Sequence, residues 1–162
     1  MGIAENLIDL HNKIPSNVKI IAVSKTMPVS SIKEAYDSGH RDFGENRVQE
    51  MEDKHRQLPS DIAWHMIGHL QTNKVKQIIP FVHLIHSVDS LRLLSIINSE
   101  AAKAGRCINC LLQMFIASEE TKFGLNHEEA WSLLSSDEYR SFRNVRVTGL
   151  MAWRHILKIR TG

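Results

Sequence analysis

Short apolar runs recur along the 162-residue chain, and segments with helical spacing of apolar residues separate them. Each run has the length of a strand, and several contain consecutive rather than alternating apolar residues. Such runs are typical of parallel strands that are covered on both faces. The pattern therefore predicts strands at residues 20–24, 41–46, 62–68, 84–88, 110–116 and 145–150.

Amphipathic helices are predicted between several of these runs. Pro28 can begin one helix and Gly39 can end it, because proline suits a first helical turn and glycine suits the position after the last one. Asp89 or Ser90 can cap another helix, which is expected to end at Gly105.

Strand and helix alternate six times, which is typical of α/β architecture with a parallel sheet. Asn126 and Glu129 add the spacing of a capping box for the helix before the last strand. A doubly wound sheet and a (β/α)8 barrel both fit this alternation. A barrel usually needs about 250 residues and eight strands. Neither glycine-rich nucleotide-binding fingerprint is present in the sequence.

The composition, with 43% apolar and 23% charged residues, predicts one globular domain. The 20 basic and 18 acidic residues are scattered, so no nucleic-acid partner is expected. Residues 1–15 form an amphipathic pattern that contains acids, unlike a signal peptide, and no run is long enough to cross a membrane. Two cysteines are too few for a disulfide framework, which predicts a cytoplasmic location.

Zinc or redox chemistry is not predicted from the cysteines and histidines. Cys107 and Cys110 form a single C-x-x-C, which supplies two of the usual four zinc ligands and is interpreted as part of a buried strand. His65 and His69 lie on either side of Gly68, so helical metal-ligand spacing does not apply, and no carboxylate pattern completes a zinc set.

Lys25 follows the first apolar run directly, and the carboxyl ends of parallel strands are where side chains reach ligands. Burial at this point would lower the pKa of the lysine, and a neutral amine attacks carbonyls, so Lys25 is a candidate Schiff-base lysine. Alternatively, Lys25 extends into solvent or pairs with Asp42 or Glu45. The residues alone leave both hypotheses open.

Polar residues lie at corresponding places on the next strands. Asn46 ends the second strand, His65 lies within the third, and His86 and Ser87 end the fourth. Together with Lys25 they would line the mouth of the sheet, and such a mouth is a small-molecule site by default.

Six segments resemble, in the same order, the pyridoxal phosphate homeostasis protein family: AVSKTMP, FGENRVQE, WHMIGHLQTNKVK, IHSVDSLRLL, EETKFGL and VTGLMA. The resemblance covers about residues 1 to 152 and implies an α/β fold, the (β/α)8 TIM-barrel-like fold of alanine racemases and other fold type III proteins. It also implies that pyridoxal 5′-phosphate forms a Schiff base with Lys25, and that Asn46, His65 and Ser87 face the cofactor. The family binds this cofactor and balances vitamin B6, without an established reaction.

The resemblance ends at residues 153–162, where the family continues with two further βα units and a phosphate-binding loop. We therefore expect residues 1–162 to form one incomplete barrel domain of about six βα units, with exposed edges that favour self-association. Three alternatives remain: an amino-acid racemase that uses the cofactor, a lysine-dependent Schiff-base lyase that does not, and a fragment that binds no ligand.

Overall fold

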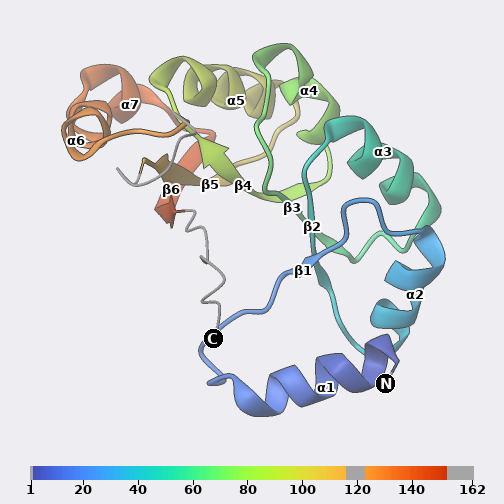
Figure 1. The fold of residues 1–162 in the computed structure, drawn as a ribbon. Coiled ribbons are helices and arrows are strands. Elements are labelled where there is room, and N and C mark those ends of the chain that lie inside the picture. Colours follow the sequence, from blue (N-terminus) through green and yellow to red (C-terminus); the bar gives the residue numbers. More distant parts are fainter. Residues whose placement is uncertain (1, 116–122, 153–162) are drawn as a thin grey trace.

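Six parallel strands form one curved sheet in the computed structural model of the chain, which describes residues 2–115 and 123–152 (Figure 1). The strands pair in sequence order. This order matches the wall of a barrel, because the strand order of a doubly wound sheet reverses at a switch point. The strands are β1 (Ala22–Val23), β2 (Asp42–Glu45), β3 (Ala63–Met66), β4 (Val82–Val88), β5 (Ile108–Met114) and β6 (Val145–Ala152).

All six predicted strands are confirmed, with different bounds. The strand β1 contains only two residues, whereas β4 and β5 each begin two residues earlier than predicted. Residue 116, the predicted end of the fifth strand, lies outside the described residues, as does the segment 153–162.

Helices lie along the outer side of the curved sheet, as Figure 1 shows for α2 to α5. Within residues 2–115 and 123–152, none of the helices is long and apolar enough to cross a bilayer. The helices are α1 (Ile3–Lys13), α2 (Val29–Asp37), α3 (Val48–Gln57), α4 (Val75–Ile78), α5 (Leu91–Lys103), α6 (His127–Ser135) and α7 (Asp137–Ser141), with a short 3-10 helix η1 at Thr72–Lys74.

Two predicted helix caps are present. The hydroxyl of Ser90, rather than Asp89, accepts a hydrogen bond of 3.1 Å from the backbone N–H of Leu93 at the start of α5. At the start of α6, Asn126 and Glu129 each accept a hydrogen bond of 2.8 Å from the other's backbone N–H, which completes the capping box. Caps of this kind stabilise a helix by about 1 kcal/mol each.

The core lies between the sheet and the outer helices. Phe43 and Trp64 fill it from the strands, and Met51 and Leu94 fill it from helices α3 and α5. Trp64 is completely buried. These side chains fix the helices against the outer face of the sheet.

The two cysteines differ from each other. Cys110 is buried in β5, as predicted, and burial raises the pKa of its thiol to about 12. Cys107 is exposed, so the predicted burial is wrong for this residue. Cys107 comes just before β5, whereas Cys110 lies within this strand.

Candidate functional site

The face of the sheet opposite the outer helices, here called the concave face, carries a row of paired residues. The strand register aligns Val23, Gly44, His65, Leu84 and Asn109 across β1 to β5. Neighbouring side chains on one strand alternate between faces, so this row lies opposite the buried outer row. The concave face is therefore the surface on which a ligand can meet several strands.

Lys25 follows β1 and lies on the exposed side of the chain. Exposure alternates along Val23, Ser24 and Lys25 as exposed, buried and exposed, and Ser24 contacts the helix side. This alternation directs Lys25 away from the helices. The predicted burial of Lys25 is wrong, because β1 is an edge strand among the described residues. Lys25 lines neither of the two pockets described below, beside Asn46 and beside Lys19.

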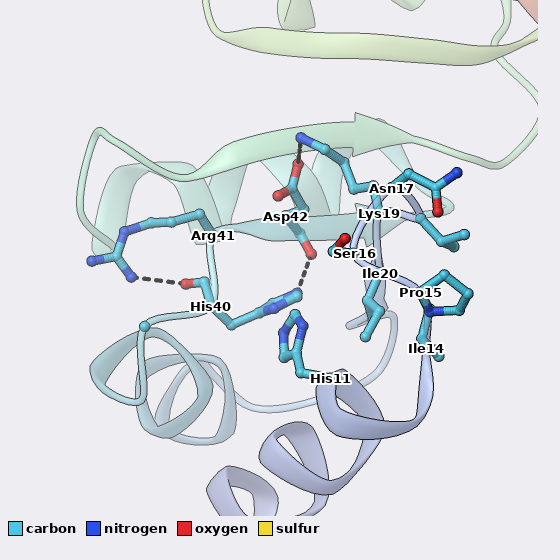
Figure 2. Close-up of a pocket in the computed structure, with 12 residues that line it drawn as sticks. His11, Ile14, Pro15, Ser16, Asn17, Lys19, Ile20, His40, Arg41 and Asp42 are labelled. Carbon is cyan, nitrogen blue, oxygen red and sulfur yellow. Dashed lines mark hydrogen bonds and ion pairs between the residues drawn. The ribbon is translucent and has the colours of Figure 1, made fainter.

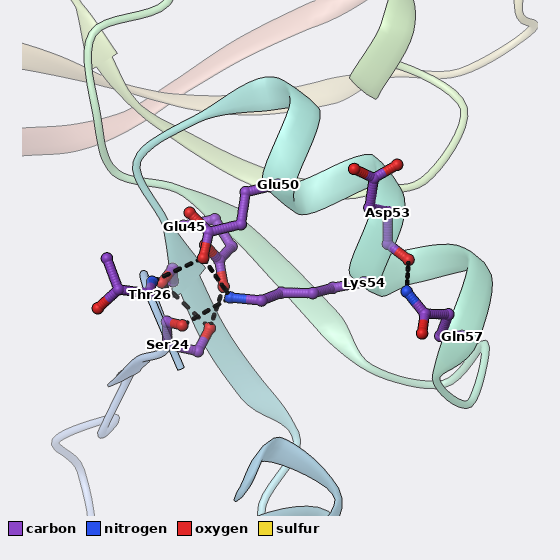
Figure 3. Close-up of polar contacts among 8 residues, drawn as sticks. Ser24, Thr26, Glu45, Glu50, Asp53, Lys54 and Gln57 are labelled. Carbon is purple, nitrogen blue, oxygen red and sulfur yellow. Dashed lines mark hydrogen bonds and ion pairs between the residues drawn. The ribbon is translucent and has the colours of Figure 1, made fainter. Parts of the chain in front are cut away.

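The two acidic partners considered for Lys25 pair with other lysines, Asp42 with Lys19 and Glu45 with Lys54. Lys54 of α3 places its ammonium 2.7 Å from the carboxylate of Glu45, where the Lys54 side chain is 7% exposed and that of Glu45 is 0% exposed (Figure 3). The same ammonium donates to the backbone oxygen of Ser24 and to Glu50, each at 2.7 Å. Lys54 is thus the centre of a buried polar network directly beside Lys25.

This network holds both neighbours of Lys25. The hydroxyl of Ser24 donates to Glu45 at 2.5 Å, and the backbone N–H of Thr26 donates to Glu50 at 2.6 Å. Thr26 has a φ of 63°, a left-handed conformation that is strained for a β-branched residue. Ser24, Thr26, Glu45, Glu50 and Lys54 therefore fix the backbone that presents Lys25, and we call them the Lys54 network.

The two acids of the network have pKa values that shift in opposite directions. Burial raises the pKa of Glu45, although hydrogen bonds from Lys54 and Ser24 counteract it. The hydrogen bond from Lys54 lowers the pKa of the more exposed Glu50. The opposite shifts follow from depth, because burial disfavours the charged form of an acid while a cation favours it.

Asn46 comes directly after β2, and its backbone lies very close to Gly68, which follows β3. Its side-chain oxygen is buried and has no hydrogen-bond partner among the described residues. A Cβ on Gly68 would lie 2.3 Å from the backbone oxygen of Asn46, so only glycine permits this approach. A pocket of about 290 Å³ opens beside Asn46 and is also lined by Arg47 and Lys74.

His65 is buried and both of its ring nitrogens are engaged. Its Nε2 lies 2.9 Å from the carboxylate of Asp42, and its Nδ1 lies 2.9 Å from Nε2 of His86. Burial alone would raise the pKa of Asp42, but hydrogen bonds from His65 and Lys19 hold it below its ordinary value. The ionised Asp42 therefore accepts a hydrogen bond from the Nε2–H of neutral His65, and Nε2–H of His86 donates to Nδ1 of His65.

The two buried histidines predict loss of stability in mild acid. Burial lowers the pKa of His65, and it lowers the pKa of His86 to about 4. Between about pH 6.5 and pH 4 the unfolded chain binds more protons than the folded chain, so stability falls as the pH falls. Urea unfolding across this range measures the slope, and His86→Gln is expected to reduce it. An unchanged slope in His86→Gln would contradict this assignment.

Ser87 is almost completely buried in β4, and its hydroxyl has no hydrogen-bond partner among the described residues. The structure thus brings Lys25, Asn46, His65 and Ser87 to four consecutive strands or strand ends, as predicted. His65 lies nearer the amino ends of the strands than Lys25 does. It pairs with Gly44, which in turn pairs with Val23, two residues before Lys25. Sequence reasoning missed Lys54, because its helix α3 is mostly polar and nothing in the local pattern marks this lysine as buried.

The chain matches the sequence model of the family described as alanine racemase, N-terminal domain, over residues 2–156. It is 42% identical over 135 residues to the pyridoxal phosphate homeostasis protein of Aquifex aeolicus, covering 82% of this chain and 58% of that protein. It is 35% identical over 164 residues to the protein of the same name from Escherichia coli, covering 93% and 69%. The chain thus spans roughly three fifths to two thirds of the length of these relatives.

Solved structures agree with this result. The structure of PipY from Synechococcus elongatus with pyridoxal phosphate bound has a TM-score of 0.86 and 36% identity, covering 94% of this chain and 70% of PipY. An alanine racemase of Clostridium difficile has a TM-score of 0.73 at 17% identity, covering 91% and 39%. The racemase shares the fold, and the sheet described above corresponds to part of a barrel.

Proposed function

Because the chain belongs to the pyridoxal phosphate homeostasis protein family, we propose that it binds pyridoxal 5′-phosphate through Lys25 and helps to balance this cofactor inside the cell. The observation that carries the proposal is the Lys54 network, which fixes the residues on both sides of one exposed lysine at the end of β1. An amine that reacts with an aldehyde must be accessible and oriented, and this arrangement supplies both properties.

The surrounding residues fit the cofactor. The side-chain oxygen of Asn46 and the hydroxyl of Ser87 are buried and have no hydrogen-bond partner within residues 2–115 and 123–152, and a polar ligand could satisfy them. Arg47 and Lys74 beside Asn46 supply positive charge that suits a phosphate group. His65 would form the bottom of the proposed cofactor site, nearer the amino ends of the strands. Bound pyridoxal phosphate would supply an aldehyde that condenses with a lysine amine.

Borohydride trapping tests this proposal. The amine of Lys25 forms a C=N bond with the aldehyde as one water leaves, and borohydride reduces that bond to a stable secondary amine. Peptide mass spectrometry is expected to find the label on Lys25 and to find none at that peptide in Lys25→Ala. Lys33→Ala, which removes an exposed lysine of α2, should leave the labelling unchanged. A label spread evenly over surface lysines, or absent from Lys25, would refute the proposal.

We further propose that the protein self-associates through its edge strands. Among the described residues, β1 and β6 each pair on one side only, and each carries an exposed apolar side chain, Val23 at 53% and Leu150 at 62%. Unpaired edges with apolar side chains favour pairing with another chain. Sedimentation velocity at rising concentration is expected to show a larger species that Leu150→Lys weakens and the control Ile8→Lys does not. A monomer at every concentration would contradict this.

A cytoplasmic location is part of the same proposal, and no nucleic acid is expected as partner. Both cysteines are free in the structure, which suits a reducing compartment. The nearly equal numbers of basic and acidic residues provide no extended cationic surface for a nucleic acid.

A further inference from the structure

Three strands bring a carboxylate and two imidazoles together at the lower part of the concave face. Asp42 begins β2, His65 lies in β3 and His83 lies in β4. Their ligand atoms all lie within 4.8 Å of one another, and Asp42 and His65 are 2.9 Å apart. The cofactor proposed above uses the carboxyl ends of the strands, whereas this cluster involves the amino end of β2.

A β-bulge explains why His83 joins the cluster. The register pairs Trp64 with Val82 but His65 with Leu84, so β4 contains one additional residue at this point, His83. Bulges redirect a side chain that regular alternation would place elsewhere. The ring of His83 consequently lies beside that of His65, with 5.2 Å between the ring centroids.

The donor set suits a borderline divalent metal ion. Two neutral imidazoles and one carboxylate are ligands that zinc accepts, and zinc sites with three protein ligands keep a fourth position open for water or another ligand. His65 is almost completely buried, so the packing around it fixes the position of its ring. Because His83 is exposed, the open position would face solvent.

A second histidine supports the ring of His65 from behind. Nδ1 of His65 lies 2.9 Å from Nε2 of His86. Metal binding at Nε2 of His65 would displace the proton that this nitrogen shares with Asp42, so His65 would take the Nδ1–H tautomer and donate to an unprotonated Nε2 of His86. Histidines that bind metals are commonly oriented by such a contact on the other ring nitrogen. His86 is itself buried, at 8% exposed.

One cation opposes metal binding at this place. The ammonium of Lys19 lies 3.0 Å from the carboxylate of Asp42, above the pocket of about 490 Å³ that His11 and His40 also line (Figure 2). The Lys19 side chain is 59% exposed and can turn into solvent when a metal replaces it. Its charge should weaken metal binding without preventing it.

We propose that Asp42, His65 and His83 form a binding site for a divalent transition metal ion of the zinc class. The proposal does not depend on the Schiff base at Lys25, because Lys25 is not one of the three ligands; His65 alone is shared with the proposed cofactor site.

Zinc titration of the chain without an affinity tag tests the site, with calorimetry for affinity and cobalt substitution for the visible absorption of the bound ion. A single site is expected, weakened about ten-fold or more in His83→Ala. The exposed His127→Ala on α6 is the matched control and should bind as the original chain does. Lys19→Gln leaves all ligands in place and should bind zinc more tightly.

Two results would overturn the proposal: equal zinc affinity in His83→Ala and the original chain, or no zinc binding by either the original chain or Lys19→Gln. Circular dichroism tests whether His83→Ala is folded. If it is not, the zinc affinity of Lys19→Gln tests the site independently. Lys25→Ala should bind zinc normally, so failure of cofactor capture and failure of metal binding can be distinguished.

Discussion

Replacing Lys54 by methionine is expected to lower the free energy of unfolding by about 3–5 kcal/mol. The substitution leaves the carboxylate of Glu45 completely buried without its cation, and removing one partner of a buried ion pair costs this much. One oxygen of Glu45 already lacks a hydrogen-bond partner among the described residues, so no spare donor there would replace the lost ammonium of Lys54. Urea unfolding followed by circular dichroism measures the loss.

Two further variants separate charge burial from other effects of the Lys54 substitution. Adding Glu45→Gln to Lys54→Met removes the unpaired charge and should recover more than half of the lost stability. Lys33→Met breaks an exposed ion pair with Asp37 and should cost less than about 1 kcal/mol. A loss in Lys54→Met no larger than in Lys33→Met would show that the buried pair does not stabilise the fold.

The same substitution tests Lys54 as a positioning residue for Lys25. Lys54 bonds the backbone oxygen of Ser24 and holds Glu50, which in turn accepts the N–H of Thr26. Its loss should slow borohydride-trapped labelling of Lys25 under conditions where the variant is still folded. Lys54→Arg retains the cation and should restore part of the labelling rate. A normal rate in folded Lys54→Met would assign Lys54 a purely structural role.

Replacing Gly68 by alanine is expected to cost about 3 kcal/mol or more, at the upper end of the range for overpacked sites. The new Cβ would lie 2.3 Å from the backbone oxygen and 2.6 Å from the Cα of Asn46. Backbone atoms cannot move aside as a flexible side chain can, so either β2 or the chain after β3 must shift. Thermal unfolding of the variant measures the cost.

Gly149→Ala is the matched control for this substitution. Its Cβ would lie 3.3 Å from the Cδ2 atom of Leu111, which can rotate, so a loss below about 1 kcal/mol is expected. Because Gly68 contacts Asn46, the Gly68 variant should also capture pyridoxal phosphate less well. Equal stability of the two alanine variants would indicate that the approach of Gly68 to Asn46 is looser than the structure shows.

Much of the fold could be predicted because the strands are short segments rich in apolar residues, and several of them contain consecutive apolar residues. Residues 62–68 and 145–150, for example, predicted β3 and β6 within two residues at each end. The capping box at Asn126 was equally local, since the bond partners are three residues apart. Alternation alone could not distinguish a barrel from a doubly wound sheet. The pairing order of the strands made that distinction.

The candidate site was predictable in part. Lys25, Asn46 and Ser87 were identifiable as polar residues at or near strand ends, but the exposure of Lys25 was not, because it depends on how neighbouring segments cover β1. The ion pair between Lys54 and Glu45 joins a polar helix to a strand. Which of several lysines reaches a given acid depends on how that helix packs on the sheet.

The sequence by itself determined the succession of strands and helices, the family and the lysine at the end of the first strand, because these depend on local order along the chain. Only the tertiary structure decided which charges are buried together and which side chains converge. The bulge at His83 and the contact of Lys54 with Glu45 both depend on register between segments, and register is set by packing across the whole sheet.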